Sequence, residues 1–299
     1  NRFPSQSCTL FTGNFNQCKS SLLEHCAHFI IWIMSPKCPE AIIYLKKLIK
    51  SIESYYHPSN GGNWSGGLGL FLQALCKALA RRALAEKNPD CKTPEEYRLT
   101  DEHIQEFTQL ILPVAQTAIY GKSTRLAISA VQALKHLTYL SPATVLPPIM
   151  ERISDALQTL TETHQTTAAM GLLSVIIFPM MQTRQFDISN YLHDLMNLSL
   201  PGIDANDPFK TFITIKFFVG LLTVMPLFTK STHDNARSTN VDGISFDHEE
   251  ENESEPLAVQ FFEDWAVELL SRIFRVLSTL TLDRKAAKTD TTERQLRPT

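Results

Sequence analysis

Residues 57–69, HPSNGGNWSGGLG, hold five of the chain's 11 glycines. Such clusters can wrap a phosphate, because backbone N–H groups at a helix N-terminus point toward an anion. This stretch spells neither GxxxxGK[ST] nor GxGxxG, and no strand pattern precedes it. The sequence therefore predicts a flexible joint between two helices, in which glycines allow unusual backbone angles and Trp64 lies on a neighbouring helix.

Two adjacent arginines, Arg81 and Arg82, follow Lys77 near the end of a helical segment. They could contact a polyanion such as a phosphorylated small molecule. Cations also accumulate at helix C-termini because they interact favourably with the helix dipole. We favour this second interpretation, and it assigns no ligand to the pair.

All six cysteines lie in the first third of the chain and form no CxxC pair. This pattern indicates free, buried thiols in a reducing compartment rather than a disulfide framework or a zinc site. His25, Cys26 and His28, with Cys18, could in principle bind a metal ion. They lie in an apolar helical segment, so we expect half-buried side chains rather than metal ligands. The six are Cys8, Cys18, Cys26, Cys38, Cys76 and Cys91.

Residues 247–255, DHEEENESE, form the one acidic run. It could hold a cation or a basic peptide, although consecutive like charges are usually solvated. No GxSxG elbow occurs, and the scattered Ser, His and Asp residues define no triad. We therefore predict a protein that is not an enzyme, with no catalytic, cofactor-binding or metal-binding residue.

The overall charge favours neither nucleic acid nor a membrane surface. With 28 Lys+Arg against 31 Asp+Glu, the formal net charge is −3, so no strong positive field attracts a polyanion. Residues 212–228 are the best candidate membrane span, but they contain Lys216 and Pro226 and fall short of the ~20 apolar residues that a span needs. We expect a helix buried among other helices.

Apolar residues recur at three- and four-residue spacing along most of the chain, which predicts an all-α fold. Thr100 is expected to cap one helix, and Ser141 with Pro142 to open another. Joints near Thr100, Ser141 and Gln182 fall about 40 residues apart, a period typical of HEAT-type helix pairs. We predict an α-solenoid of HEAT-like helix pairs, whose neighbours share a continuous core.

Composition divides the chain into four predicted parts. HEAT-like repeats occupy residues 1–230, and an acidic, disordered loop follows over residues 231–255. A further solenoid helix spans residues 256–283, and residues 284–299 form a polar tail. Because the first residue is Asn, we expect a piece of a longer polypeptide.

Several segments in series carry a family resemblance: HPSNGGNW, LFLQALCKALARR, RLTDEHIQEFTQLILPVAQTAIYGK, SPATVLPPIMERISDALQTLTETHQTTAAM, LPGIDANDPFKTFITIKFFVGLLTVMPL and FEDWAVELLSRIF. Together, over about residues 45–274, they resemble the middle region of the giant single-chain HEAT-repeat proteasome activators. Gly66, Gly67 and Gly69 and the acidic run depart from the usual pattern.

The resemblance implies a solenoid dome that caps the 20S proteasome core particle and opens or reshapes its gate. It implies ATP-independent degradation of peptides and of unfolded or acetylated proteins, including acetylated histones, a role in DNA repair, and a location in nucleus and cytoplasm. Inositol phosphates are implied as ligands of the full-length protein. It implies direct binding to neither nucleic acid nor a membrane.

Two family devices have no counterpart in this sequence. The chain ends in Arg297, Pro298 and Thr299, not in the family's gate-opening tripeptide of a hydrophobic residue, Tyr and any residue. No segment matches the family's acetyl-lysine-reading region. An alternative interpretation is a karyopherin-like nuclear transport receptor, since those HEAT arrays also carry acidic loops.

Overall fold

The computed structural model describes residues 15–159, 163–183, 189–224 and 259–295. Within these ranges every regular element is a helix, and the one β feature is an isolated bridge between Ser35 and Cys38. The predicted all-α class is confirmed. The chain forms two compact units, Asn1–Val145 and Leu146–Thr299, and the division falls inside helix α6.

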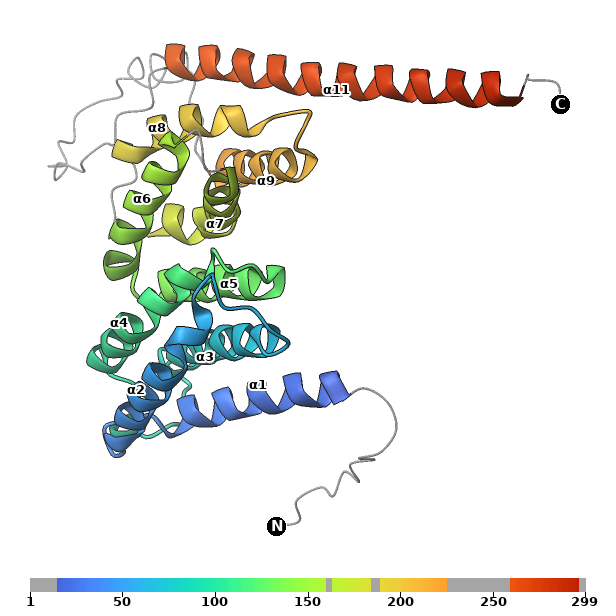
Figure 1. The fold of residues 1–299 in the computed structure, drawn as a ribbon. Coiled ribbons are helices and arrows are strands. Elements are labelled where there is room, and N and C mark those ends of the chain that lie inside the picture. Colours follow the sequence, from blue (N-terminus) through green and yellow to red (C-terminus); the bar gives the residue numbers. More distant parts are fainter. Residues whose placement is uncertain (1–14, 160–162, 184–188, 225–258, 296–299) are drawn as a thin grey trace, which may run out of the picture. The chain divides into compact units, whose positions relative to one another are not determined.

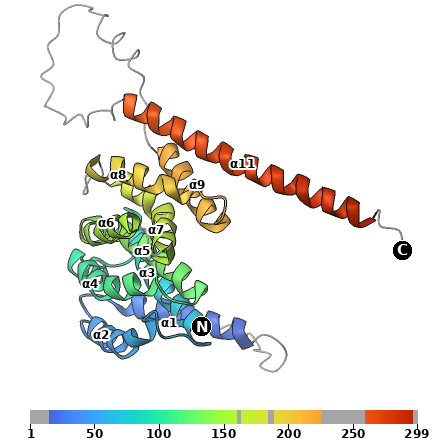
Figure 2. The ribbon, with the colours of Figure 1, turned by 45° about the horizontal axis from the view of Figure 1, so that its top comes forward.

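The first unit consists of two layers of helices (Figures 1 and 2). Helices α2 and α4 form one layer, and α1, α3 and α5 lie side by side in the other. Each α2–α3 and α4–α5 pair is a HEAT-like hairpin, as predicted. The elements are α1 (Phe15–Ile33), α2 (Glu40–Ile52), η1 (Glu53–Tyr56), α3 (Ser65–Glu86), η2 (Glu95–Tyr97), α4 (Asp101–Ala118) and α5 (Thr124–Leu140).

Local signals set the helix starts. The Oγ1 atom of Thr100 accepts a hydrogen bond from the backbone N–H of His103 at 3.3 Å, which confirms Thr100 as the N-cap of α4. Asp101 and Glu102 occupy the first turn, where carboxylates favour the positive end of the helix dipole. Pro142 begins α6 (Pro142–Gln158), also as predicted.

The core of the first unit lies between its two layers. Phe107 and Ile111 of α4 and Leu72, Leu75 and Leu79 of α3 are fully buried. Burial of each such side chain contributes about 1.5–3 kcal/mol before other costs. Neither layer could bury this surface alone, so the helix pairs depend on each other for stability.

The second unit repeats the pairing. Helix α7 packs along α9, and fully buried Met170, Leu173, Ile177, Phe217 and Leu221 fill its interior. The elements are α6, α7 (Thr163–Gln182), α8 (Ser189–Ser199), η3 (Leu200–Gly202), α9 (Pro208–Val224) and α11 (Val259–Gln295). The fold class predicted from the 40-residue period, an α-solenoid of HEAT-like helix pairs, is confirmed.

Helix α11 is fixed to this unit by Trp265. Its indole N–H donates to the carbonyl of Met196 at 3.1 Å, and its ring meets Phe218 edge-on at 5.1 Å. The helix starts at Val259, close to the predicted residue 256, but continues to Gln295, beyond the predicted limit at residue 283. The predicted acidic loop, residues 231–255, lies outside the described residues.

Two apolar helices bear on the membrane prediction. Phe217, Phe218 and Leu221 of α9 are buried, as expected for residues 212–228, of which the last four lie outside the described residues. By length and composition alone, a different helix segment within α7, His164–Gln182, is long and apolar enough to span a bilayer. Half of that window is buried inside the fold.

Candidate functional site

Gly61 and Gly62 lie in the joint before α3, whereas Gly66, Gly67 and Gly69 lie in the first turns of α3 itself. Polar groups of the joint bond to one another. The backbone N–H of Gly62 donates to Oγ of Ser65 at 3.1 Å, and the N–H of Ser65 donates to the carbonyl of Gly62 at 3.0 Å. The hydroxyl of buried Tyr56 donates to the carbonyl of Leu68 and so ties η1 to α3. The joint is a closed turn, and the prediction that it connects two helices is confirmed.

The glycines of the joint provide space rather than unusual backbone angles. None of the glycines in the described part of the chain has a φ in the left-handed region, so that part of the prediction was wrong. A Cβ on Gly69 would lie 3.1 Å from Cα of Leu126, and one on Gly62 would lie 2.6 Å from Nε1 of Trp64. Trp64 itself packs edge-on against Tyr55, at 5.1 Å between ring centroids.

Arg82 acts as a clamp on the end of α1. Its guanidinium donates to the carbonyl oxygens of Ile31, Trp32 and Met34, and to that of Tyr97. Its Nε pairs with Glu86 at 2.6 Å, with both side chains mostly buried. The last carbonyls of a helix lack partners within the helix, so Arg82 supplies them from α3. It therefore has a structural role, consistent with the interpretation that assigns no ligand to Arg82.

Arg81, the neighbour of Arg82 on α3, is exposed and acts together with other cations on His136. His136 on α5 is half-buried, and burial lowers its pKa to about 4, with further lowering by Lys135, Lys77 and Arg81. The imidazole is therefore neutral near pH 7 and surrounded by three positive charges. Sequence reasoning singled out Arg81 and Lys77 but missed Lys135 and His136. Only the side-by-side packing of α3 and α5 brings the four together.

The thiols are mostly not buried. Cys76 is fully buried, and burial raises its pKa, but Cys38 and Cys91 are partly exposed and Cys26 is exposed. The prediction of buried thiols thus holds for Cys76 and was wrong for the other three. Cys8 lies outside the described residues, and the side chain of Cys18 is not described.

His25 and His28 are exposed on α1, as is Cys26, and not half-buried as expected. Among the described residues, no three His, Cys, Asp or Glu side chains lie together in a way that could hold a metal ion. Hydrogen bonds from the backbone and from the side chain of Thr93 lower the pKa of the partly exposed Cys91, and the backbone bond has the larger effect.

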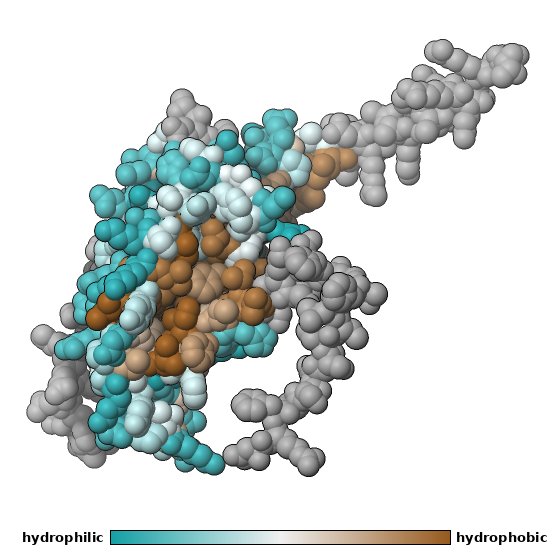
Figure 3. Space-filling view, turned by 60° about the horizontal axis from the view of Figure 1, so that its bottom comes forward, coloured by the Kyte–Doolittle hydropathy of each residue, from teal (hydrophilic) through white to brown (hydrophobic). Residues whose placement is uncertain are grey.

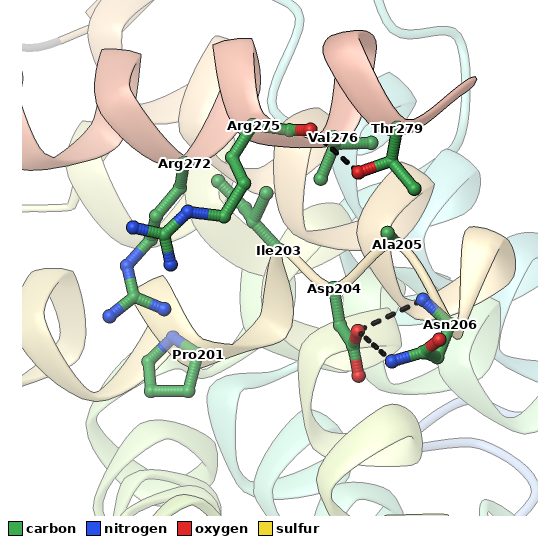
Figure 4. Close-up of a pocket in the computed structure, with 9 residues that line it drawn as sticks. All are labelled: Pro201, Ile203, Asp204, Ala205, Asn206, Arg272, Arg275, Val276 and Thr279. Atoms are coloured by element: carbon green, nitrogen blue, oxygen red, sulfur yellow. Dashed lines mark hydrogen bonds between the residues drawn. The ribbon is translucent and has the colours of Figure 1, made fainter. Parts of the chain in front are cut away.

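The second unit has a pocket of about 340 Å³ between α11 and residues 201–206, which precede α9 (Figure 4). Arg272 and Arg275 enter it from α11, and Asp204 lies on the opposite side. Arg272 is paired with Glu268 at 2.7 Å, and Oδ1 of Asp204 accepts hydrogen bonds from the N–H and side-chain amide of Asn206. The residues that line the pocket form no nucleophile–base pair.

The first unit exposes apolar side chains on its outermost helix. A space-filling view from the α1 end shows brown, apolar surface gathered there (Figure 3). Leu22, Phe29 and Trp32 of α1 are 64%, 60% and 75% exposed. Large exposed apolar patches are typical of surfaces that another element covers.

Comparison with known proteins decides what this stack of helix pairs belongs to. The family described as "Proteasome activator complex subunit 4, mid HEAT repeats region" matches residues 45–298. The chain belongs to this family. The match begins where the resemblance in the sequence begins and continues past residue 274, through the rest of α11 and into the residues after it.

Curated relatives agree with the proteasome activator family. Proteasome activator complex subunit 4 of Homo sapiens is 32% identical over 273 residues, 88% of this chain. Subunit 4B of Danio rerio is 30% identical over 276 residues, and proteasome activator subunit 4 of Arabidopsis thaliana is 29% identical over 268. The chain spans only 14% of the length of each of these relatives.

Family membership favours the activator interpretation over the transport receptor. It also accounts for a chain of stacked helix pairs whose polar clusters are largely structural. The acidic run, residues 247–255, on which the karyopherin alternative rested, lies outside the described residues.

Proposed function

We propose that this chain forms part of the wall of a solenoid dome that caps the 20S proteasome core particle. The full-length protein would promote the degradation of peptides and of unfolded or acetylated proteins, acetylated histones among them, without ATP. The observation that carries the proposal is the family match over residues 45–298. The relatives are named as proteasome activators, which supports an association with the proteasome.

The chain itself would contribute surface and curvature, not catalysis. Stacked helix pairs present extended surfaces rather than a reactive cleft. The pocket described above supports this, because Arg272 pairs with Glu268, Asp204 accepts from Asn206, and its lining residues form no catalytic arrangement. In this proposal, all peptide-bond hydrolysis takes place in the core particle.

The remaining properties follow from the family and extend the proposal. The protein would act in the nucleus and the cytoplasm and take part in DNA repair. It would need no cofactor for activation, although inositol phosphates would bind the full-length protein. It would bind neither nucleic acid nor a membrane directly, in keeping with a net charge of −3.

The test uses the full-length protein with purified 20S core particles and a fluorogenic peptide, with ATP left out. We expect faster peptide hydrolysis and co-sedimentation of the two proteins. The activator alone, and the mixture after active-site inhibition of the core particle, should show no hydrolysis. Recovery of a small nuclear GTPase instead of 20S subunits would favour a transport receptor.

A further inference from the structure

Helices α3 and α5 run side by side in the same direction. A Cβ added to Gly66 would lie 3.6 Å from Cδ of Arg125, and one added to Gly69 would lie 3.1 Å from Cβ of Ser129. Both positions advance together along the two helices, so later residues of α3 also lie beside later residues of α5. Lys77 and Arg81 thereby come to lie near Lys135 and His136, which explains how their charges reach His136.

Four cations lie along this helix pair. Residues four apart lie on the same side of a helix, which groups Lys77 with Arg81 on α3. Lys135 joins this group because it acts on His136 together with Lys77 and Arg81, and Arg125 lies beside Gly66 at the start of the pair. We call these four the α3–α5 basic face. Arg81 and Arg125 are exposed, and Lys77 and Lys135 are partly exposed.

The α3–α5 basic face has no acidic counterpart on its own helices. Helix α5 contains no Asp or Glu, and the one acidic residue of α3 is Glu86. Glu86 is already bound by Arg82 and by the backbone N–H of Leu99. No member of the face forms an ion pair with any other residue in the described ranges. Its charge is therefore available to a ligand.

Apolar side chains separate these cations. Leu70 and Leu84 of α3 are 42% and 74% exposed, and Ile128 and Tyr139 of α5 are 58% and 49% exposed. Leu70, Lys77 and Leu84 are each seven residues apart, so they lie along one line on α3. The surface thus offers cations and apolar contacts in alternation.

The spread of the charges decides the kind of ligand. Arg125 and Lys135 are ten residues apart, or about 15 Å along the helix at ~1.5 Å per residue. A single compact phosphate cannot contact both ends. An extended peptide covers that distance with about five residues, at ~3.3 Å each, and its side chains can supply carboxylates and apolar groups in turn.

We propose that the α3–α5 basic face binds an extended, acidic peptide segment of another polypeptide, one that carries apolar residues between its carboxylates. Carboxylates would pair with Arg81, Arg125 and the two lysines, and the apolar residues would contact Leu70, Leu84 and Ile128. Helices α3 and α5 offer these cations no unpaired carboxylate, so we assign the ligand to a different molecule. This inference does not depend on proteasome activation.

The test measures binding of a labelled 12-residue peptide of alternating Glu and Leu by its fluorescence anisotropy, as the full 299-residue chain is added. The probe variant is Arg81→Glu with Arg125→Glu, and the matched control is Lys50→Glu with Lys92→Glu. All four positions are exposed, and each pair changes the net charge equally. Denaturation curves of both variants check that each is folded.

We expect the Kd of the probe variant for the peptide to rise about tenfold or more, because its two new glutamates repel the peptide's carboxylates where two arginines attracted them. The Kd of the control variant should change less than about twofold. A Lys and Leu peptide with the same label should not bind. Equal losses in both variants, or no binding by the intact chain, would overturn the proposal.

Two competitors test the identity of the ligand. Tripolyphosphate or a single-stranded oligonucleotide that displaces the peptide at equal or lower concentration would show that the face selects phosphate, and would also overturn the proposal. A chain with residues 247–255 neutralised provides the last comparison. If only that chain binds the peptide, the run within the chain is the occupant, and the assignment to another molecule is wrong.

Discussion

Gly202 and Thr214 approach so closely that a Cβ on Gly202 would lie 2.2 Å from Oγ1 of Thr214. The Thr214 hydroxyl cannot easily move away, because it is fully buried and donates to the carbonyl of Lys210 at 2.9 Å. A glycine is therefore required where η3 passes over α9. This contact fixes the joint that also forms one wall of the pocket in the second unit.

Gly202→Ala should destabilise the second unit by about 1–3 kcal/mol, as overpacking does elsewhere. The matched control is Gly171→Ala in α7, where an added Cβ meets nothing within 4 Å. That change should stabilise the helix by about 0.5–1 kcal/mol. Urea denaturation of the two variants provides the measurement, and equal effects would show that the Thr214 contact is not tight.

Arg82→Met should destabilise the first unit by about 2–4 kcal/mol, because it leaves the part-buried carbonyls of Ile31 and Met34 and the buried Glu86 carboxylate without their charged donor. Arg81→Met, at the exposed neighbouring position, should change stability by no more than about 0.5 kcal/mol. Amide hydrogen exchange should also accelerate at the end of α1 in the Arg82 variant alone. Unchanged exchange there would contradict the clamp.

Trp265→Ala should release the N-terminal half of α11, at a cost of about 3–5 kcal/mol for a buried aromatic side chain. Trp265→Phe keeps a ring against Phe218 but loses the hydrogen bond to Met196, so we expect a smaller loss of about 1 kcal/mol. Phe274→Ala, on the same helix and 65% exposed, serves as the control. Hydrogen exchange over residues 262–280 reports the release.

Acidification should weaken the first unit through His136. Its pKa is about 4 in the folded chain and 6.5 ordinarily, so between these values the unfolded chain binds more protons. The contribution of His136 to stability is complete above pH 6.5 and declines as the pH falls toward 4. The difference in unfolding free energy between the parent chain and His136→Gln should therefore shrink from pH 7 to pH 5. A constant difference would mean that burial and the neighbouring cations do not lower the pKa of the His136 ring.

The starts of α4 and α6 could be predicted from sequence because their causes are local. Thr100 is three residues from the N–H that it caps, and Pro142 starts a helix through its own fixed φ. The role of Arg82 could not be predicted in this way, since it contacts Met34, 48 residues earlier. The same holds for His136, whose neighbours Lys77 and Arg81 come from another helix.

The glycine joint shows a different limit of sequence reasoning. Its composition correctly indicated a turn between helices, but a glycine chosen for a left-handed angle and one chosen for close approach have the same sequence signature. Only the positions of Leu126 and Trp64 reveal that space is the reason here. The repeat period could have suggested this close approach, because in stacked helix pairs the second helix of one pair packs against the second helix of the next.

The clamp by Arg82 also has a consequence for synthesis on the ribosome. Helix α1 receives the donor for Ile31 from a residue 51 positions later. At roughly 5–20 residues per second, translation leaves that helix end without its partner for several seconds after it emerges. During this interval the nascent α1 terminus is open to chaperones, and it closes only when α3 has left the exit tunnel.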